Sequence, residues 1–448
     1  MPKNSNSPLL RIVVGLLASA AAVFALIRSQ ELATHSGAID FYQFWLIGQF
    51  IDQPGYGDIY AEAVYDRIGT AGLVYAQRSE SQRLKAAAST NAQIYAHKIE
   101  PISTPALYAA FKLVSSGDYE TDADRYQLAC SLVFAVAVVV LARAARFGWA
   151  ASLCALAVTV WSFGPFKVDI LDGNVARLQL AGLAMAVGAV AFLPQRVGRI
   201  IAGLLLALNV MFKPNVALVA GLIVLVYAFR REWRAALEVL AGMLVGVLIA
   251  VVGSAIYLGN FGLWPKWIGA IFAASRSSAQ VYTLESQNCS ISRVISGAVH
   301  FNASWPLLGV AMVVILLAIW RARSSNRLGA GESATYAVGV GLLAMLISSP
   351  IVWPSYFVFL LPSMIYLARP AAINTRAIAR WAIAGAVFLC VGTSDGPWLR
   401  LDLSVLIYVL AAACAALLMM ASVDYAIGER PAPNQKEPRP APIEPSVA

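Results

Sequence analysis

The chain alternates long apolar runs with shorter polar connections over most of its length. A helix of about 17–25 apolar residues, flanks included, is long enough to cross a bilayer. The pattern predicts an all-α polytopic membrane protein with about 12 transmembrane helices. Their apolar cores lie near 12–28, 126–142, 149–164, 177–193, 199–212, 215–229, 236–258, 304–320, 334–350, 355–368, 380–394 and 403–421.

One pair of these runs is separated by a very short break. The runs 199–212 and 215–229 flank Lys213-Pro214-Asn215, whose last residue begins the second run. The pattern fits either a tight hairpin of two helices or one broken element. A proline at such a break requires that protein or water satisfies the carbonyl groups it leaves free.

Two long hydrophilic segments interrupt the apolar pattern. Apolar residues between Phe41 and Phe50 fall at roughly helical spacing, and the segment 103–114 shows a similar pattern. Amphipathic helices in the membrane interface are therefore expected in both segments. The expected organisation is an N-terminal transmembrane helix (1–28), an outer-face loop with interfacial helices (29–125), transmembrane helices (126–258), a second outer-face loop (259–303), transmembrane helices (304–421) and a disordered cytoplasmic tail (422–448).

Composition indicates that lipid is the solvent for most of this chain of 448 residues. Hydrophobic residues make up 59% and charged residues 13%, whereas soluble proteins have about 45–50% and about 25%. These values exclude a water-soluble globule, a disordered chain and a disulfide scaffold. The five cysteines form no C-x-x-C pair, so neither a metal framework nor a disulfide framework is indicated.

Charge sets the expected orientation. The chain has 33 basic and 24 acidic residues, a net charge of +9. In a soluble chain this excess would suggest nucleic acid, but in a membrane protein basic residues mark the cytoplasmic loops. We therefore expect no nucleic-acid partner, a multi-pass protein of the cell (inner) membrane, both termini in the cytoplasm and both long polar segments outside. The arginine-rich loops hold Arg143/Arg146, Arg196/Arg199, Arg230/Arg231/Arg234, Arg321/Arg323/Arg327 and Arg369/Arg376/Arg380.

The first apolar run allows a second interpretation. Lys3 and Arg11 followed by sixteen apolar residues also fit a secretory signal. We expect a retained helix closed by Arg28, and cleavage would leave the remaining topology unchanged. The segment after 429 alternates proline with alanine, arginine and glutamate, so nothing in it could offset the entropy of ordering.

Asp40 is the acidic residue whose setting is most unusual. It lies within Ala38-Ile39-Asp40-Phe41-Tyr42-Gln43-Phe44-Trp45, shortly after the first apolar run. A carboxylate among apolar and aromatic residues is costly unless a partner or a function retains it. The alternative is that Asp40 caps a helix over 41–53, a position that also suits aspartate.

Other polar clusters favour structural interpretations. Asp122-Ala123-Asp124 is a D-x-D pattern, which can hold a metal and a nucleotide diphosphate, but acids that directly precede an apolar run are expected to stabilise the first turn of a helix. The histidines His35, His97 and His300 are scattered and follow no metal motif. No metal site and no cofactor is therefore expected.

A series of short motifs follows in order between about 38 and 368: Asp40-Phe41-Tyr42-Gln43-Phe44-Trp45, Gly57-Asp58-Ile59-Tyr60, Asp172-Gly173-Asn174-Val175-Ala176, Gly203-Leu204-Leu205-Leu206-Ala207-Leu208, Phe212-Lys213-Pro214-Asn215, Arg230-Arg231-Glu232-Trp233-Arg234, Gln287-Asn288-Cys289-Ser290 and Ser349-Pro350-Ile351-Val352-Trp353-Pro354-Ser355-Tyr356. Together these motifs resemble glycosyltransferase family 87. Members of this family are polyprenyl-phosphate-sugar-dependent hexosyltransferases of the GT-C fold, largely mannosyltransferases. The family often has a histidine after the tryptophan of its S-P-I-x-W motif, where this chain has Ser355 and Tyr356, and Asn174 and Ala176 replace its usual Gln and Asn.

The resemblance implies an enzyme that moves a hexose, most often mannose, from a polyprenyl-phosphate donor to an envelope lipid or glycan acceptor, with inversion. An acid in the first outer loop would be the base, which maps onto Asp40. A cationic side chain is needed beside the leaving phosphate to offset its developing negative charge. The candidates for this phosphate-binding role are Lys213, Arg293 and Arg177, although the side chain of Lys213 could instead extend to the membrane interface. The candidate substrate-binding residues are Tyr42, Asn174, Gln287, Asn288, Trp353 and Tyr356.

Two other functions remain open from the sequence. A transporter or flippase of lipid-linked sugars would also be apolar, but it should show related halves and polar residues at mid-membrane depth, and no internal repeat is visible. A non-catalytic membrane protein of envelope assembly is the other alternative. Membrane lipids are expected partners in every case.

Overall fold

The computed structural model describes residues 8–95, 103–281, 288–293, 295, 304–324, 328–370, 375–393 and 408–419. All regular elements within these ranges are helices, so the predicted all-α class is confirmed. Several predicted features lie outside the described residues, namely Gln287, His97, His300 and the tail 422–448.

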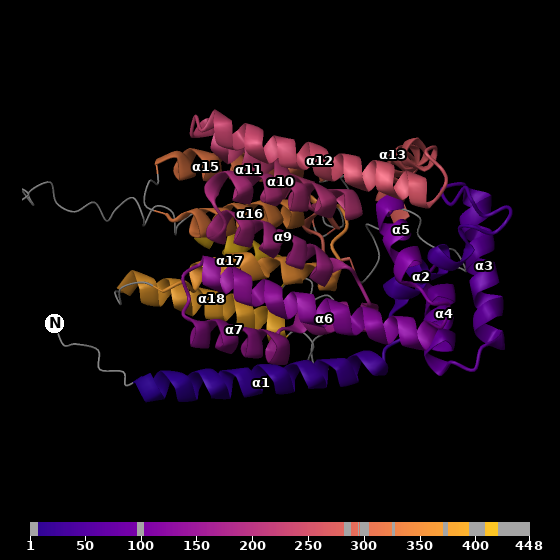
Figure 1. Cartoon of the computed structure of the whole chain (residues 1–448), viewed down its shortest axis with the longest axis horizontal. Coiled ribbons are helices and arrows are strands. Elements are labelled where there is room, and N and C mark those ends of the chain that lie inside the picture. Colours follow the sequence, from indigo (N-terminus) through magenta and orange to yellow (C-terminus); the bar gives the residue numbers. More distant parts are fainter. Residues whose placement is uncertain are drawn as a thin grey trace, which may run out of the picture.

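Most helices run side by side in one bundle (Figure 1). The described residues of each of the twelve predicted apolar runs fall on helices of this bundle. Its members are α1 (Pro8–Thr34), α6 (Tyr119–Ala144), α7 (Trp149–Ser162), α8 (Gly164–Asp172), α9 (Ala176–Phe192), α10 (Gln195–Phe212), η1 (Pro214–Val216), α11 (Ala217–Phe229), α12 (Trp233–Tyr257), α15 (Ser304–Ser324), α16 (Ala330–Ser348), η2 (Pro354–Leu360), α17 (Leu361–Leu367), α18 (Thr375–Thr393) and a last helix, Tyr408–Met419.

Membrane character follows from the length and composition of these helices. Within the described ranges, five helices are long and apolar enough to cross a membrane: parts or all of α1, α6, α10, α12 and α16. Helices α7 and α8 make a sixth candidate if their 60° bend lies within one span. The other predicted runs fall on shorter apolar helices, so the figure of about 12 spans stays a prediction.

The short break at Lys213-Pro214-Asn215 forms a tight hairpin. The guanidinium of Arg199, near the start of α10, lies 5.6 Å from the ring centre of Tyr227, near the end of α11. The two helices therefore run in opposite directions, and one broken element is excluded. Gln179 satisfies a carbonyl at the break, because its side-chain amide donates to the oxygen of Lys213 at 2.9 Å.

Helices α10 and α12 approach each other so closely that their contact positions leave no room for a Cβ atom. A Cβ atom added to Gly203 would lie 2.0 Å from the carbonyl oxygen of Val239, and one added to Gly242 would lie 2.0 Å from that of Ile200. Gly246 follows Gly242 by one helical turn and faces α10 as well. Small residues at this spacing let two helix backbones touch, which is how helices commonly pair in lipid.

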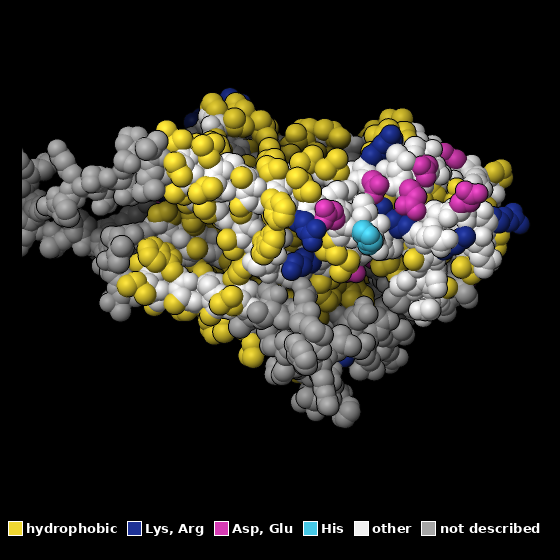
Figure 2. All heavy atoms as spheres, turned by 90° about the horizontal axis from the view of Figure 1, so that it is seen from below, with side chains coloured by type: hydrophobic (Ala, Val, Ile, Leu, Met, Phe, Trp, Pro, Cys, Tyr) yellow, Lys and Arg dark blue, Asp and Glu magenta, His cyan; other side chains and the backbone are white. Residues whose placement is uncertain are grey.

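A smaller group of helices covers one end of the bundle, consisting of α2 (Ile39–Phe50), α3 (Glu62–Arg78), α4 (Gln82–Tyr95), α5 (Pro105–Val114) and α13 (Leu263–Val281). In Figure 2, charged side chains gather at this end, whereas the rest of the visible described surface is largely hydrophobic. The distribution agrees with a bundle in lipid and a polar group of helices outside it.

Two features of this region were not expected from the sequence. Residues Phe41–Ile47 of α2 are all buried, so protein covers both faces of this helix. Its aromatic side chains pack on those of α5 and α6. Helix α1 also continues to Thr34, beyond the expected end at Arg28, and α6 begins at Tyr119, before the expected boundary at 125. The polar first turns of α6 are helical because Asp118 caps this helix by accepting from the backbone amide of Glu120.

Candidate functional site

A cavity of about 390 Å³ lies where the polar group of helices meets the bundle. It gathers residues that are far apart in the chain, including five of the predicted site residues: Asp40, Asn174, Lys213, Trp353 and Tyr356. The remaining lining residues are Gln43, Phe44, Ser103, Pro214, Asn215, Ile271, Ser349 and Ile351.

Asp40 lies in the first turn of α2 and does not cap it. The cap position is Ala38, which has a left-handed backbone (φ 49°) and makes no side-chain cap bond. The side-chain amide of Asn174, in the turn between α8 and α9, donates a hydrogen bond to Oδ2 of Asp40. The capping interpretation of Asp40 is therefore wrong.

The surroundings act on the Asp40 carboxyl in opposite directions. Burial raises its pKa above the ordinary value, because the charged form loses water. The positive charge of Lys213 and the hydrogen bond from Asn174 both lower the pKa of Asp40 and so favour the carboxylate. A group with this balance has raised proton affinity and two partners that retain its charge, which suits a general base.

The turn that carries Asn174 is fitted closely to the turn before Asp40. Gly173 ends α8 in the left-handed region (φ 66°), and a Cβ atom there would lie 2.8 Å from that of Ala38. Only glycine combines this backbone with such close contact. The hydroxyl of Tyr126 donates to the carbonyl oxygens of Gly173 at 3.1 Å and Asn174 at 2.7 Å. The close packing of these two turns therefore fixes the positions of Asp40 and Asn174 relative to each other.

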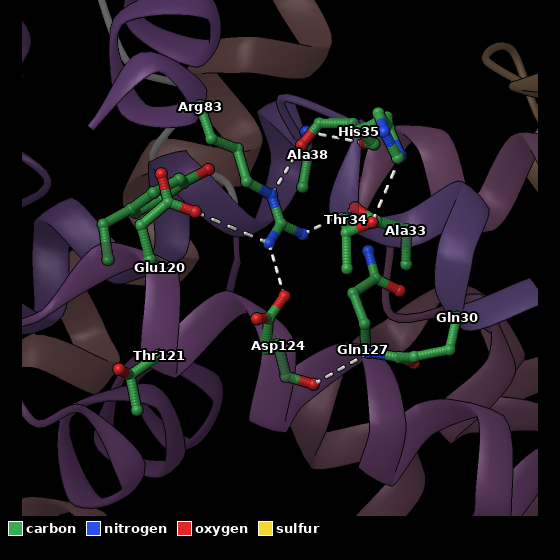
Figure 3. Close-up of polar contacts among 12 residues, drawn as sticks. Gln30, Ala33, Thr34, His35, Ala38, Arg83, Glu120, Thr121, Asp124 and Gln127 are labelled. Atoms are coloured by element: carbon green, nitrogen blue, oxygen red, sulfur yellow. Dashed lines mark hydrogen bonds and ion pairs between the residues drawn. The ribbon is translucent and has the colours of Figure 1, made fainter. Parts of the chain in front are cut away.

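Arg83 fixes the other side of the same turn (Figure 3). Its buried guanidinium donates to the carbonyl oxygens of Ala33 at 2.8 Å and Ser36 at 2.7 Å. It also forms an ion pair with Asp124 at 2.6 Å. Arg83 thereby joins the end of α1 to α4 and α6. One of its acceptors, Ser36, lies four residues before the candidate base Asp40. The sequence offered no signal for this role.

The D-x-D pattern serves packing within the protein. Asp122 lies in the first turn of α6, as expected, and accepts from the indole nitrogen of Trp45 at 2.9 Å and from the backbone amide of Ser116 at 2.8 Å. Asp124 is occupied by Arg83. Within the described ranges, no group of three or more His, Cys, Asp or Glu side chains has a metal-binding arrangement.

Lys213 reaches the cavity from the break between α10 and η1. It ends α10 with an extended backbone, and Gln179 holds the break by donating to its carbonyl oxygen and to Asn215 Oδ1 at 2.7 Å. Its ammonium nitrogen lies 5.1 Å from the ring centre of Tyr356. This cation faces the cavity near Asp40, where it could meet an anionic ligand.

The third wall of the cavity is the segment from Ser349 to Tyr356. Asn288 is fully buried and fastens this segment, because its Nδ2 donates to the oxygen of Pro350 at 3.0 Å and its Oδ1 accepts from the amide of Val352 at 3.0 Å. Trp353 and Tyr356 line the cavity as a result. Their aromatic faces are surfaces on which a sugar ring can pack.

Several predicted site residues lie away from the cavity. Arg177 is fully buried, paired with Asp169, and donates to Gln127 at 2.5 Å. Arg293 donates to the carbonyl oxygen of Asn288 at 2.9 Å, and Tyr42 packs within the polar group of helices. None of these, nor Asn288, is among the residues that line the cavity. The polar lining residues that the prediction omitted are Gln43, Ser103, Asn215 and Ser349, and all of them except Ser103 lie inside the quoted motifs.

Comparison with known proteins gives two matches. Residues 101–350 match the model of glycosyltransferase family 87. Over 244 residues the chain is 25% identical to a Mycobacterium tuberculosis protein named polyprenol-phosphate-mannose-dependent alpha-(1-2)-phosphatidylinositol mannoside mannosyltransferase. That alignment covers 54% of this chain and 52% of the relative, so the chain spans about half the length of the curated relative it matches.

No solved structure matches the chain significantly. The family match is independent of the cavity, yet the matched region contains Asn174, Lys213 and Ser349, which line it. Since the family model covers more than half of the sequence, this protein belongs to glycosyltransferase family 87.

Proposed function

We propose that this protein is a hexosyltransferase that uses a polyprenyl-phosphate sugar as its donor. The observation that carries the proposal is the cavity, in which a carboxylate, a lysine and two aromatic rings meet. A transporter needs no such pairing of a base with a phosphate-binding cation. Family membership supports the same reaction class, and the name of the mycobacterial relative favours mannose as the sugar.

The proposed reaction is a single displacement with inversion. Asp40 removes the proton from a hydroxyl of the acceptor, whose oxygen attacks the anomeric carbon of the sugar. The bond between that carbon and the phosphate oxygen breaks, and the polyprenyl phosphate leaves with the electron pair. Lys213 offsets the negative charge that develops on this phosphate. Phosphate is a weak base, so the step requires no strong general acid.

The proposed substrates follow from this geometry. The polyprenyl tail would remain in lipid while the sugar phosphate enters the cavity at the end of the bundle. The arginine distribution supports an outer-face site in the cell membrane, since the basic loops belong to the opposite end of α6 and α10. The acceptor would be an envelope lipid or glycan with a free hydroxyl.

Replacement of Asp40 by Asn tests the proposal. Asn keeps the shape of the side chain and removes the proton acceptor, and a positioned base typically contributes about 10²–10⁴-fold. We expect Asp40→Asn to lower sugar transfer from a radiolabelled polyprenyl-phosphate mannose at least about 100-fold. Thermal stability and donor binding should change little.

Asp52→Asn is the matched control. Asp52 follows the end of α2, is exposed, pairs with Lys112 at 2.5 Å and lies outside the cavity, so its loss should leave transfer near the wild-type rate. Near wild-type transfer by Asp40→Asn would remove Asp40 as the base. Absence of transfer from any polyprenyl-phosphate sugar by the unmodified protein would favour the transporter or the assembly protein.

A further inference from the structure

A second cavity, of about 240 Å³, lies in the bundle among α9, α10, α11 and α16. Its inner wall is apolar and its mouth carries arginines. The apolar lining is Ala186, Val187, Val190, Ala202, Ile223, Val226, Leu328, Ala330, Ala334 and Ala337, and the polar lining is Gln195, Arg199, Tyr227, Arg230, Glu232 and Ser333.

This cavity belongs to the end of the bundle opposite the candidate active site. Helix α10 ends at Phe212, beside Lys213 of the first cavity, but it contributes its first turns, around Arg199, to the second. Helix α11 likewise begins next to the first cavity and ends at the second, where Arg230 follows it. The two cavities therefore lie toward opposite ends of α10 and α11.

The mouth of the second cavity is suited to an oxyanion. The half-buried guanidinium of Arg199 donates from Nη1 to Glu238 at 3.0 Å and lies over the ring of Tyr227. Arg199 also shares a side-chain hydrogen bond with Tyr227. A guanidinium has five N–H groups in a planar fork, so these two bonds leave donors for a phosphate oxygen. Arg230 pairs loosely with Glu232, at 3.3 Å, and presents a second cation.

The walls indicate what carries this oxyanion. Valine, isoleucine and alanine side chains line the interior, and nearby α11 also exposes Leu225 and Phe229 on the surface of the bundle. Apolar side chains offer no favourable contact to inorganic phosphate, whereas they can pack against the acyl chain of a lipid. The volume is below the roughly 300–1,000 Å³ of pockets that enclose a whole drug-sized ligand, so part of the ligand must remain in the membrane.

We propose that this cavity binds an anionic phospholipid of the surrounding membrane. The phosphodiester would lie against Arg199 and Arg230, and the first part of one acyl chain would fill the apolar interior between α9, α11 and α16. Basic pockets between membrane helices at an arginine-rich surface recognise anionic head groups in this way. The site is separate from the proposed sugar transfer and does not depend on it.

The test compares two lipids on the purified, delipidated full chain. Phosphatidylglycerol and phosphatidylcholine of equal acyl length are titrated, and bound lipid is counted by native mass spectrometry. We expect phosphatidylglycerol to bind at one site, and Arg199→Gln to weaken that binding about tenfold, since a charge-assisted hydrogen bond is lost. Arg234→Gln, at an exposed arginine outside the cavity, is the matched control and should change it little.

A second variant separates binding from a structural role of Arg199. Glu238→Gln removes the competing negative charge and leaves a weaker acceptor for Nη1, so phosphatidylglycerol should bind more tightly than to the unmodified protein. If Arg199 only stabilises the bundle, Glu238→Gln would leave binding unchanged or weaker, which contradicts the proposal. Equal affinity for the two lipids, equal losses in Arg199→Gln and Arg234→Gln, or displacement of the lipid by an equal concentration of inorganic phosphate would each overturn it.

Discussion

At the scale of single residues, the candidate site is a carboxylate held between two partners from different parts of the chain. Asp40 begins α2, Asn174 precedes α9, and Lys213 ends α10. Burial disfavours the charge on Asp40, and its two partners favour it. Each partner therefore has a consequence that can be measured separately.

Lys213 should act through its charge. Lys213→Met keeps the length and apolar character of the side chain but removes the cation, whereas Lys213→Arg retains it. If the ammonium offsets charge on the leaving phosphate, transfer should fall by about 10²–10³-fold in Lys213→Met and far less in Lys213→Arg. The measurement is the steady-state rate with the polyprenyl-phosphate donor, with folding checked by size exclusion. Equal activity of the two variants would assign Lys213 to anchoring at the interface.

Asn174 should act on the pH dependence. Its hydrogen bond lowers the pKa of Asp40, so Asn174→Ala should raise that pKa further. A higher pKa leaves less carboxylate at a given acidic pH, so the acid limb of the kcat/KM profile should move to higher pH. The loss of rate should be greatest at low pH and shrink above the limb.

Asn215→Ala is the matched control for this profile. Asn215 lines the same cavity, but its Oδ1 accepts from Gln179 and not from a group bonded to Asp40. Its acid limb should stay where the unmodified enzyme has it. An unshifted limb in Asn174→Ala would show that the hydrogen bond to Asp40 does not tune the base.

At the scale of elements, turns and close helix pairs decide where the site residues lie. The turn after α8 fits against the turn after α1, and Arg83 ties that turn to α4 and α6. The pairing of α10 with α12 places the end of α10, and with it Lys213, at the cavity. This pairing rests on backbone contact at Gly203 and Gly242.

Two glycines of α12 should respond oppositely to alanine. A Cβ atom at Gly242 would lie 2.0 Å from the carbonyl oxygen of Ile200, so the helices must separate. We expect Gly242→Ala to destabilise the protein by about 1–3 kcal/mol or more, as overpacking does. Gly253 has nothing within 4 Å of such an atom, so Gly253→Ala should be neutral or stabilise by about 0.5–1 kcal/mol. Thermal unfolding in detergent measures both, and an equal effect of the two substitutions would contradict close packing at Gly242.

At the scale of the whole molecule, the bundle has two chemically different ends. One end carries α2 to α5 and the cavity with Asp40, and the other carries the arginines that follow α6 and α11. Membrane proteins with such an uneven distribution of basic residues insert with their basic loops in the cytoplasm. The proposed sugar transfer would then occur outside, and the proposed phospholipid site would face the inner leaflet.

Reporter fusions test this orientation. Fusions after Arg146 and Arg234 should give a cytoplasmic signal, and a fusion near Gly117 should give an external one, because Gly117 and Arg146 lie at opposite ends of α6. A cytoplasmic signal from the Gly117 fusion would place the cavity on the wrong face for an outer acceptor.

The sequence alone determined the helical class, the positions of the apolar helices and the family. Lipid requires every backbone polar group to be satisfied within a segment, so a run of apolar residues of sufficient length specifies its own structure. Motifs such as Asp40-Phe41-Tyr42 and Phe212-Lys213-Pro214-Asn215 likewise need no tertiary information to be read. The same reasoning fails for polar residues, whose role depends on which partner lies opposite.

Only the tertiary structure decided among those roles. It joins Asp40 to Asn174 and brings Lys213 to the same cavity, but it buries Arg177 against Asp169 and turns Asn288 into a fastening for another segment. In the sequence these residues look alike, since each is a polar group beside an apolar run. A hydrogen bond or ion pair is satisfied by distance in space and not by spacing along the chain, so the packing of helices selects which polar residues face a ligand and which hold the protein together.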